Sequence, residues 1–231
     1  MSSEVDLIRD RYARRTDTVV PGYDPMLPWV YMMAQEKERA LIKLFQRFSI
    51  APVQSKRVIE IGCGTGGNLL QLLRLGFRPE NLVGNELLEE RAAAARELLP
   101  AGTRIVGGDV CELDLPSATF DVVYQSTVFT SILDESFQER MARRMWQWPR
   151  PGGGVLWYDF TFDNPLNPDV RGVPVPRIRQ LFPEGTVFAR RITLAPPIAR
   201  LLTRVHPQLY TAANLLPFLR THVLCWIRKN D

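Results

Sequence analysis

The chain has 231 residues, of which 45% are hydrophobic, and a formal net charge of +4. This length predicts one domain with room for a cap, and the hydrophobic fraction is sufficient for a full core. No block of five or six like charges occurs, so the charge does not indicate a nucleic-acid partner, and we expect none.

The three cysteines are odd in number and far apart, which excludes a disulfide framework and a zinc cluster and is typical of a reducing compartment. The N-terminus lacks the basic and apolar regions of a signal peptide. No apolar run reaches the roughly 18–20 residues of a membrane span. These features predict a cytoplasmic protein without a membrane span.

Residues 1–52 precede the first strand pattern and are predicted to form a helical extension. A charged helix is expected over residues 4–15, a proline-rich loop over residues 21–28, and a helix with apolar residues at helical spacing over residues 32–48. In an α/β protein such a segment often closes over a ligand as a lid. The alternative is a helix that only packs against the core.

Residues 53–231 are predicted to form the main domain, which begins with alternating strand and helix patterns. The expected strands span residues 58–61, 82–85, 104–106, 121–124 and 155–158, and the expected helices span 68–75, 89–98 and 135–146. Such alternation predicts an α/β fold with a doubly wound, mostly parallel sheet and helices on both faces.

The last third of the chain is less regular. We expect a helical turn at 177–181, a strand at 186–194, a short helix opening at Ala195, an apolar helix at 209–218 and a closing strand at 221–228. The two strands predict an antiparallel edge of the sheet. Residues 160–220 are expected to form part of a substrate cap, whose apolar segments offer a lid or a homodimer contact.

The stretch from Val58 to Asn68 is the strongest functional signal. A β-branched run leads into glycines and then into a helix. Glycines tolerate positive φ and let a ligand approach bare backbone, and the first amides of the helix face that ligand with a partial positive charge. Gly62, Gly64 and Gly67 satisfy the GxGxxG pattern, which NAD-binding folds also use.

Two carboxylates refine this signal. Glu86 lies at the end of the second strand, where a carboxylate accepts hydrogen bonds from ribose hydroxyls; the alternative is a solvated residue near a helix start. Glu60 lies two residues before the first glycine. A pyrophosphate is unfavourable beside a fixed carboxylate, whereas a ligand with a cationic amine and a sulfonium is favoured there.

Five motifs in this order resemble the class I S-adenosylmethionine-dependent methyltransferases. They are residues 58–67 (VIEIGCGTGG), 82–87 (LVGNEL), 108–113 (GDVCEL), 120–125 (FDVVYQ) and 151–156 (PGGGVL). Their order over about a hundred residues is more specific than any single motif. The resemblance implies a Rossmann-like, seven-stranded sheet with an antiparallel last strand and S-adenosyl-L-methionine as the cofactor.

The resemblance also implies which residues contact the cofactor. Glu60 and the glycine turn would lie near its methionyl end, Glu86 on its ribose, and Asp109 with the amide of Val110 at its adenine. The residues implied in cofactor binding are Glu60, Gly62, Gly64, Asn68, Glu86, Asp109, Val110 and Gln125.

The first helix adds further candidates. Tyr12, Arg14 and Arg15 either close over the cofactor and meet an anionic acceptor, or lie on the exposed face of an amphipathic helix. Tyr12 and Arg15 are therefore included among the expected cofactor contacts.

Two segments depart from the family pattern. Asn85 stands where an apolar strand residue is usual. Trp148-Pro149-Arg150 replaces the usual apolar end of a helix, and an interior proline there would distort the helix at a cost of roughly 3 kcal/mol.

A narrower resemblance is to a bacterial subgroup of these enzymes, carried by residues 11–15, 126–129, 156–160, 164–172 and 194–200. It implies direct in-line O-methylation of a small molecule, such as a sugar or a secondary metabolite. The alternatives are N- or C-methylation, a nicotinamide-dependent oxidoreductase, and a cofactor-binding protein without catalysis.

Acceptors bind outside the carboxyl ends of the parallel strands, which directs attention to polar residues there. Asp159, at the end of the fifth strand, is either a general base or hydrogen-bond acceptor for the substrate, or a carboxylate that caps the following loop. His206 either reaches into the pocket from a loop or lies on the surface. His222 is expected to be structural.

A metal-dependent reaction would need a cluster of oxygen ligands around a hard cation. Asp163 and Asn164 lie close to Asp159 in the sequence, but they are typical of a loop before Pro165. We therefore expect no metal.

Overall fold

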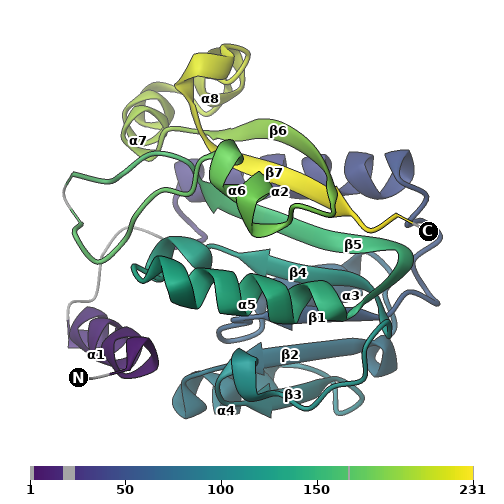
Figure 1. Ribbon diagram of the computed structural model, residues 1–231. Coiled ribbons are helices and arrows are strands. Elements are labelled where there is room, and N and C mark those ends of the chain that lie inside the picture. Colours follow the sequence, from purple (N-terminus) through teal and green to yellow (C-terminus); the bar gives the residue numbers. More distant parts are fainter. Residues whose placement is uncertain (1–2, 18–23, 166, 231) are drawn as a thin grey trace.

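The computed structural model describes residues 3–17, 24–165 and 167–230. Its centre is a seven-stranded sheet in the order β3-β2-β1-β4-β5-β7-β6, with helices on both faces (Figure 1). Strand β7 runs antiparallel to both of its neighbours, whereas the pairs from β3 to β5 are parallel. The predicted α/β fold with an antiparallel last strand is confirmed.

The first part of the domain alternates between strands and helices as predicted. Its elements are β1 Val58–Ile61, α3 Gly67–Arg74, η1 Pro79–Asn81, β2 Leu82–Glu86, α4 Glu89–Leu98, β3 Arg104–Gly107, η2 Val110–Glu112, β4 Phe120–Ser126, η3 Phe129–Ser131, α5 Glu135–Gln147 and β5 Pro149–Phe160.

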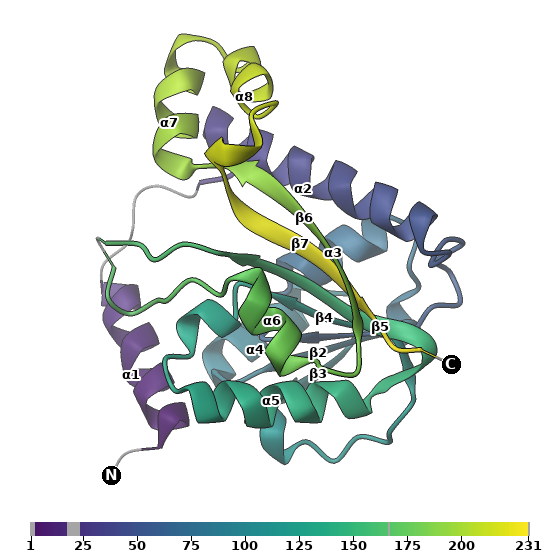
Figure 2. The same cartoon turned by 45° about the horizontal axis from the view of Figure 1, so that its top comes forward.

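The side chains of each strand alternate between two cores, one on each face of the sheet. In β5, Val155 and Trp157 lie in the core formed with α5 and α6 (Val175–Leu181), and Leu156 and Tyr158 lie in the core formed with α2 (Pro28–Arg47) and α3. Figure 2 shows α5 and α6 on one side of the sheet and α2 and α3 on the other. This alternation decides which polar side chains share a face.

The chain begins with two helices, α1 (Glu4–Asp17) and α2. Helix α2 starts four residues before the predicted residue 32, because Pro28 occupies the first helical position, where its missing N–H costs nothing. The buried residues Leu41, Leu44 and Phe45 of α2 pack against the sheet. The other end of α2 reaches the C-terminal helices, as described below.

The predicted distortion at Pro149 is wrong. Helix α5 ends at Gln147, and Pro149 is the first residue of β5, a position where proline needs no ladder donor. Residues 151–154, which precede the predicted strand at 155–158, also lie inside β5. A Cβ at Gly154 would come within 2.4 Å of the carbonyl oxygen of Ile227, so this glycine permits the close approach of β7.

The C-terminal part consists of α6, β6 (Thr186–Leu194), α7 (Pro196–Val205), α8 (Gln208–Ala213), η4 (Pro217–Leu219) and β7 (Arg220–Arg228). The predicted helix over 209–218 is wrong. Helix α8 ends at Ala213 because Pro217 has no N–H to continue it, and the Asn214 carbonyl accepts from the Arg220 guanidinium instead.

Candidate active site

The glycine turn joins β1 to α3 in the conformation that its sequence requires. Gly62, Gly64 and Gly66 all have positive φ, at 63°, 57° and 89°. A Cβ at Gly62 would lie 2.6 Å from a methyl group of Val128, so a larger residue would close the space above the turn. The turn therefore presents bare backbone at the carboxyl ends of the strands.

The turn is fastened to the neighbouring strand β2. The Cys63 amide donates to the carbonyl oxygen of Asn85 at 2.9 Å, and the Gly64 amide donates to Oε2 of Glu86 at 2.7 Å. The side chain of Asn85, which departs from the family pattern, donates to the carbonyl oxygen of Gly108 at 3.0 Å. Asn85 thus joins the ends of β2 and β3, where an apolar side chain offers no donor.

A first cavity, the α1 cavity, lies between the carboxyl ends of β1, β2 and β4 and the helix α1. Its lining includes Tyr12, Gly62, Glu86, Asp109 and Val110. These are five of the expected cofactor contacts, so the structure brings them together around one space.

Most of the polar groups of the α1 cavity already have protein partners. Glu86 is buried and accepts from the amides of Gly64 and Leu88, and Asp109 accepts from the Cys111 amide at 2.9 Å. The Arg91 guanidinium lies 5.1 Å from the ring centre of Tyr12, so a cation–π contact holds α1 over the cavity.

A second cavity, the α2 cavity, lies on the other side of the turn and under α2. It is lined by Val30, Met33, Ala34, Lys37, Gly62, Cys63, Gly64, Thr65, Gly67, Asn68, Arg91, Ser126, Thr127, Tyr158 and His222. The α1 and α2 cavities share Gly62, Arg91, Ser126 and Thr127 in their walls. One ligand can therefore contact both spaces across the turn.

Lys37 is the polar residue that α2 contributes to this cavity. Its ammonium donates to Oδ1 of Asn68 at 2.9 Å and to Oγ of Ser126 at 3.0 Å, and it lies 4.4 Å from the ring centre of Tyr158. Burial lowers the pKa of Lys37 to about 8, against the opposing effect of nearby carboxylates, of which Glu60 is the strongest.

Glu60 lies beneath the turn, as its position in the sequence predicted. Its Oε1 accepts from the Asn68 side chain at 2.6 Å, and its Oε2 has no hydrogen-bond partner among the described residues. Burial raises the pKa of Glu60, although the Asn68 hydrogen bond and the Lys37 charge act in the opposite direction. Glu60, Asn68 and Lys37 form a chain of polar groups along one wall.

His222 lies in the wall of the α2 cavity, although the sequence indicated a structural role. Its ring stacks on Tyr158, with ring centres 5.1 Å apart, and its Nδ1 contacts the Thr221 hydroxyl at 3.0 Å. Burial, together with the charge of Lys37, lowers the pKa of His222 to about 4. The imidazole is therefore neutral at neutral pH.

His206, which the sequence offered as a catalytic candidate or a surface residue, is exposed after the last turn of α7. Its Nδ1 accepts from the Gln208 amide, and His206 is not in the lining of either cavity. The structure does not bring it to the site.

Asp159 lies on the opposite face of the sheet from the α2 cavity. It is fully buried, its Oδ1 accepts from the Thr130 hydroxyl at 2.7 Å and its Oδ2 accepts from the Thr130 amide. Burial raises the pKa of Asp159 to about 7. Because Tyr158 points to the α2 side, strand alternation turns Asp159 away from it, and Asp159 lines neither cavity.

Two other expected cofactor contacts are Gln125 and Arg15, of which Gln125 is not in the lining of either cavity. Gln125 is fully buried, its Oε1 accepts from the Val128 amide at 3.1 Å, and its Nε2 has no partner among the described residues. The side chain of Arg15 lies outside the described residues.

Within the described residues, no group of three or more His, Cys, Asp or Glu side chains is arranged to hold a metal ion.

Sequence reasoning missed Lys37 and undervalued His222. Residues 36–39 alternate between acid and base on a helix and look like an ordinary solvated face. The alternation of side chains along the strands did indicate the other polar residues on this face of the sheet. Glu60 pairs with Tyr124, and Ser126 pairs with Tyr158, so these side chains lie on one face. Only the packing of α2 shows that Lys37 lies above them.

The site suits a nucleoside that carries an amino acid. The Oε2 of buried Glu60, which has no partner among the described residues, is an acceptor for a cationic amine, and Gly62 of the turn lines both cavities. The buried Glu86 carboxylate at the end of β2 suits ribose hydroxyls.

Comparison with known proteins agrees with this description. Residues 58–153 match the family model described as a methyltransferase domain. Over 86 residues, 37% of this chain, the sequence is 40% identical to the malonyl-[acyl-carrier protein] O-methyltransferase of Bacteroides fragilis. Over 162 residues, 64% of this chain, it is 33% identical to the fatty-acid O-methyltransferase of Mycolicibacterium smegmatis. The matched stretches span 17% and 57% of these two relatives.

The fold has solved counterparts. A SAM-dependent methyltransferase from Archaeoglobus fulgidus superposes with a TM-score of 0.60 at 16% identity, over 86% of this chain and 99% of that one. None of the described helices is long and apolar enough to cross a membrane. Together with the five motifs and the glycine turn, the family match identifies a methyltransferase domain over residues 58–153, in the fold of the solved S-adenosylmethionine-dependent methyltransferases.

Proposed function

We propose that this protein transfers the methyl group of S-adenosylmethionine to an oxygen of a small molecule, and that this oxygen belongs to a carboxylate held beside Lys37. The observation that carries the proposal is the Lys37 ammonium in the wall of the α2 cavity, next to the turn that binds the donor. The proposal has two parts, the place of the donor and the chemistry of the acceptor.

The donor would lie across the turn, with its nucleoside in the α1 cavity. Glu86 would hold the ribose, Asp109 and the Val110 amide the adenine, and Glu60 with the turn and Asn68 the methionyl end. When bound, this cofactor supplies a methyl group on a sulfonium, which is already activated for displacement. The protein then contributes mainly by positioning the two reactants, which is worth up to about 7–11 kcal/mol in favourable cases.

The acceptor would lie in the α2 cavity. A carboxylate there accepts charge-assisted hydrogen bonds from the Lys37 ammonium, and Ser126 offers a second donor. The aliphatic and thioether side chains of Val30 and Met33 provide an apolar wall for the rest of the molecule. A small acid with an apolar chain fits this combination.

The titratable groups of the described wall favour a carboxylate over a sugar hydroxyl, because Lys37, with its pKa of about 8, is mainly an ammonium at neutral pH. An alcohol loses its proton during transfer and needs a base within hydrogen-bond reach. His222, with its pKa lowered to about 4, is a poor base, and Asp159 faces the other core. A carboxylate is already ionised. The relative named as a fatty-acid O-methyltransferase supports the same acceptor class.

A panel of acceptors tests this proposal. The full chain would be incubated with S-adenosylmethionine and one of four acceptors: a medium-chain fatty acid, the matching fatty alcohol, a phenol and a hexose. Mass spectrometry would then detect the methylated product. We expect the methyl ester of the acid to form and the alcohol and hexose to remain unchanged. Methylation of the hexose or of the fatty alcohol, with the acid inert, would contradict the proposal.

A phenol is the second candidate, because of the pKa of Lys37. With a pKa of about 8, Lys37 in its neutral form is a possible base for a phenol. The two candidates differ in their pH profiles. If Lys37 acts as a base it must be deprotonated, so the rate with a phenol rises through pH 8. If Lys37 binds a carboxylate it must be the ammonium, so the rate with an acid falls above pH 8.

A further inference from the structure

Helices α7 and α8 form a projection beyond the β6–β7 edge of the sheet (Figures 1 and 2). Their inner side is packed: Ala199 and Tyr210 share a buried cluster with Trp29 of α2 and Leu194 of β6. The Tyr210 hydroxyl also donates to Glu36 of α2 at 2.6 Å. The projection is therefore packed against the domain through its inner side, and its outer side is a surface of fixed position.

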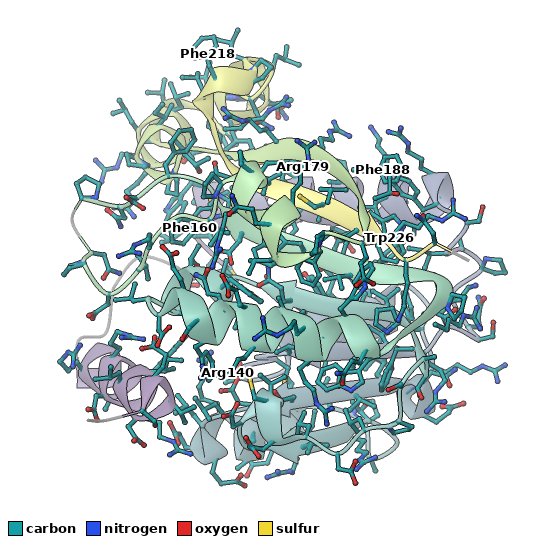
Figure 3. The ribbon with its side chains drawn as sticks, in the orientation of Figure 1. Arg140, Phe160, Arg179, Phe188, Phe218 and Trp226 are labelled. Atoms are coloured by element: carbon teal, nitrogen blue, oxygen red, sulfur yellow. The ribbon has the colours of Figure 1, made fainter. Side chains whose placement is uncertain are left out.

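The outer side carries large apolar side chains. We call it the outer cap surface, and its members are Leu201, Val205, Leu209, Leu215, Leu216 and Phe218. Val205, Leu215 and Phe218 are 77%, 73% and 71% exposed. Figure 3 shows Phe218 at the tip, pointing away from the domain. Single exposed apolar residues are ordinary, but a cluster on one projection marks an interaction site.

The segment that carries this surface has charges of one sign. The sequence contains no acidic residue between Glu184 and Asp231. Arg200 and Arg204 are exposed on α7, and the Arg200 guanidinium lies 4.9 Å from the ring centre of Trp29. An apolar surface on a segment whose charged side chains are arginines suits a partner that offers apolar groups and negative charge together.

We propose that the outer cap surface docks on an anionic lipid bilayer. Apolar side chains at the tip would enter the boundary between headgroups and acyl chains, and the arginines would meet lipid phosphates. Juxtaposed basic residues gain from the negative potential of such a surface, and this gain is screened by salt. The apolar side chains and the arginines that make these two contributions lie in one segment of the chain.

A second copy of this chain suits the surface less well. A two-fold contact would place the same patch against itself. The arginines of both copies would then face each other, without an acid in the segment to pair with them. A phospholipid surface provides the missing anions.

The buried cluster beneath the cap lies next to the α2 cavity. Val30 and Met33 of α2 pack against the buried cluster under the cap, and both also line the α2 cavity. Docking would bring the mouth of this cavity near the lipid. The docking inference does not depend on the proposed acceptor, because vesicle binding is measured without methyl transfer.

Sedimentation with vesicles tests the inference. The full chain would be mixed with vesicles of phosphatidylcholine alone or with vesicles of phosphatidylcholine and phosphatidylglycerol. We expect binding to the anionic vesicles at least about tenfold stronger, and weakening when salt is raised from about 0.1 M to about 1 M. Leu215→Asp and Phe218→Asp should each lower binding about tenfold or more. Arg204→Gln should lower binding to the anionic vesicles only.

Controls separate docking from misfolding and from self-association. Leu98→Asp changes a similarly exposed leucine at the end of α4 and should bind vesicles like the parent. Unchanged binding of S-adenosylhomocysteine would show that each variant is folded. The inference is overturned by a chain that stays in the supernatant with both vesicles, or by equal binding to both that salt does not change. It is also overturned by dimers in light scattering that Phe218→Asp dissociates.

Discussion

The two cavities on either side of the glycine turn use different chemistry. The α1 cavity is lined mainly by apolar side chains, together with carboxylates that accept from backbone amides, such as Glu86 from Gly64 and Asp109 from Cys111. The α2 cavity contains side chains with displaced pKa values, Lys37 and His222, and borders Glu60. Displaced pKa values gather at sites of chemistry, so the second cavity is the place to look for catalysis.

The comparison teaches that the two spaces should respond differently to mutation. Changes in the α1 cavity should weaken cofactor binding, whereas changes in the α2 cavity should alter acceptor kinetics and pH dependence. Four measurements test this assignment of the cofactor to the α1 cavity and of the acceptor to the α2 cavity. Each can show that a residue has been assigned the wrong role.

Glu86→Ala should have the largest effect. If Glu86 accepts from both ribose hydroxyls, its loss removes two charge-assisted hydrogen bonds and should weaken S-adenosylhomocysteine binding on the order of 1000-fold in calorimetric titration. The exposed Glu90→Ala is the matched control. Because Glu86 also holds the Gly64 amide, Glu86→Gln, which keeps one acceptor oxygen, tests the assignment if the alanine variant is unstable. Unchanged affinity in either variant would refute the ribose contact.

His222→Phe should change the pH dependence of stability. The folded pKa of His222 is about 4, below the ordinary 6.5, so the unfolded chain binds more protons between these values. Wild-type stability from this group is therefore complete above pH 6.5 and lost as the pH falls toward 4. The phenylalanine variant lacks this loss, so its stability relative to wild type should rise by up to about 3 kcal/mol on acidification.

Chemical denaturation at several pH values measures this difference. His206→Phe, on the exposed turn after α7, should show the wild-type pH dependence. A parallel course of the His222→Phe and wild-type curves would mean that His222 is not buried as a neutral group.

Lys37→Met should separate the two cavities. Loss of the ammonium should lower kcat/KM for a carboxylate acceptor about 30-fold, mainly through KM, because a charge-assisted hydrogen bond is worth roughly 1.5–3 kcal/mol. The affinity for S-adenosylhomocysteine should change by less than about threefold. Lys43→Met, on the exposed side of the same helix, should leave both values unchanged. If Lys37→Met instead weakens cofactor binding as strongly, Lys37 holds the carboxylate of the donor.

Tyr12→Ala should have the smallest effect. Removing the ring deletes the contact with Arg91 and part of the cavity wall, which should weaken S-adenosylhomocysteine binding about fivefold. Leu7→Ala, on the exposed side of the same helix, should bind like the parent. An acceptor KM that rises while cofactor binding is constant would place α1 on the acceptor side.

Local sequence patterns were sufficient for most of the fold and for the α1 cavity. The β-branched runs, the glycine turn and the alternation of strands with helices all act over short stretches of chain, so they determined β1 to β5 and the positions of Glu60, Glu86 and Asp109. They failed where a distant partner decides the outcome. Pro149 begins a strand because it pairs with Phe120 in β4.

The acceptor side depended on tertiary structure for the same reason. Strand alternation placed Asp159 and Tyr158 on opposite faces, and only the position of α2 shows which of these faces is the α2 cavity. Lys37 and His222, 185 positions apart, meet the same space because α2 crosses the carboxyl ends of the strands. The sequence by itself determined the glycine turn, where the donor is proposed to bind, since its residues are neighbours along the chain. The tertiary structure alone decided which side chains face the acceptor, since they come from segments that only folding brings together.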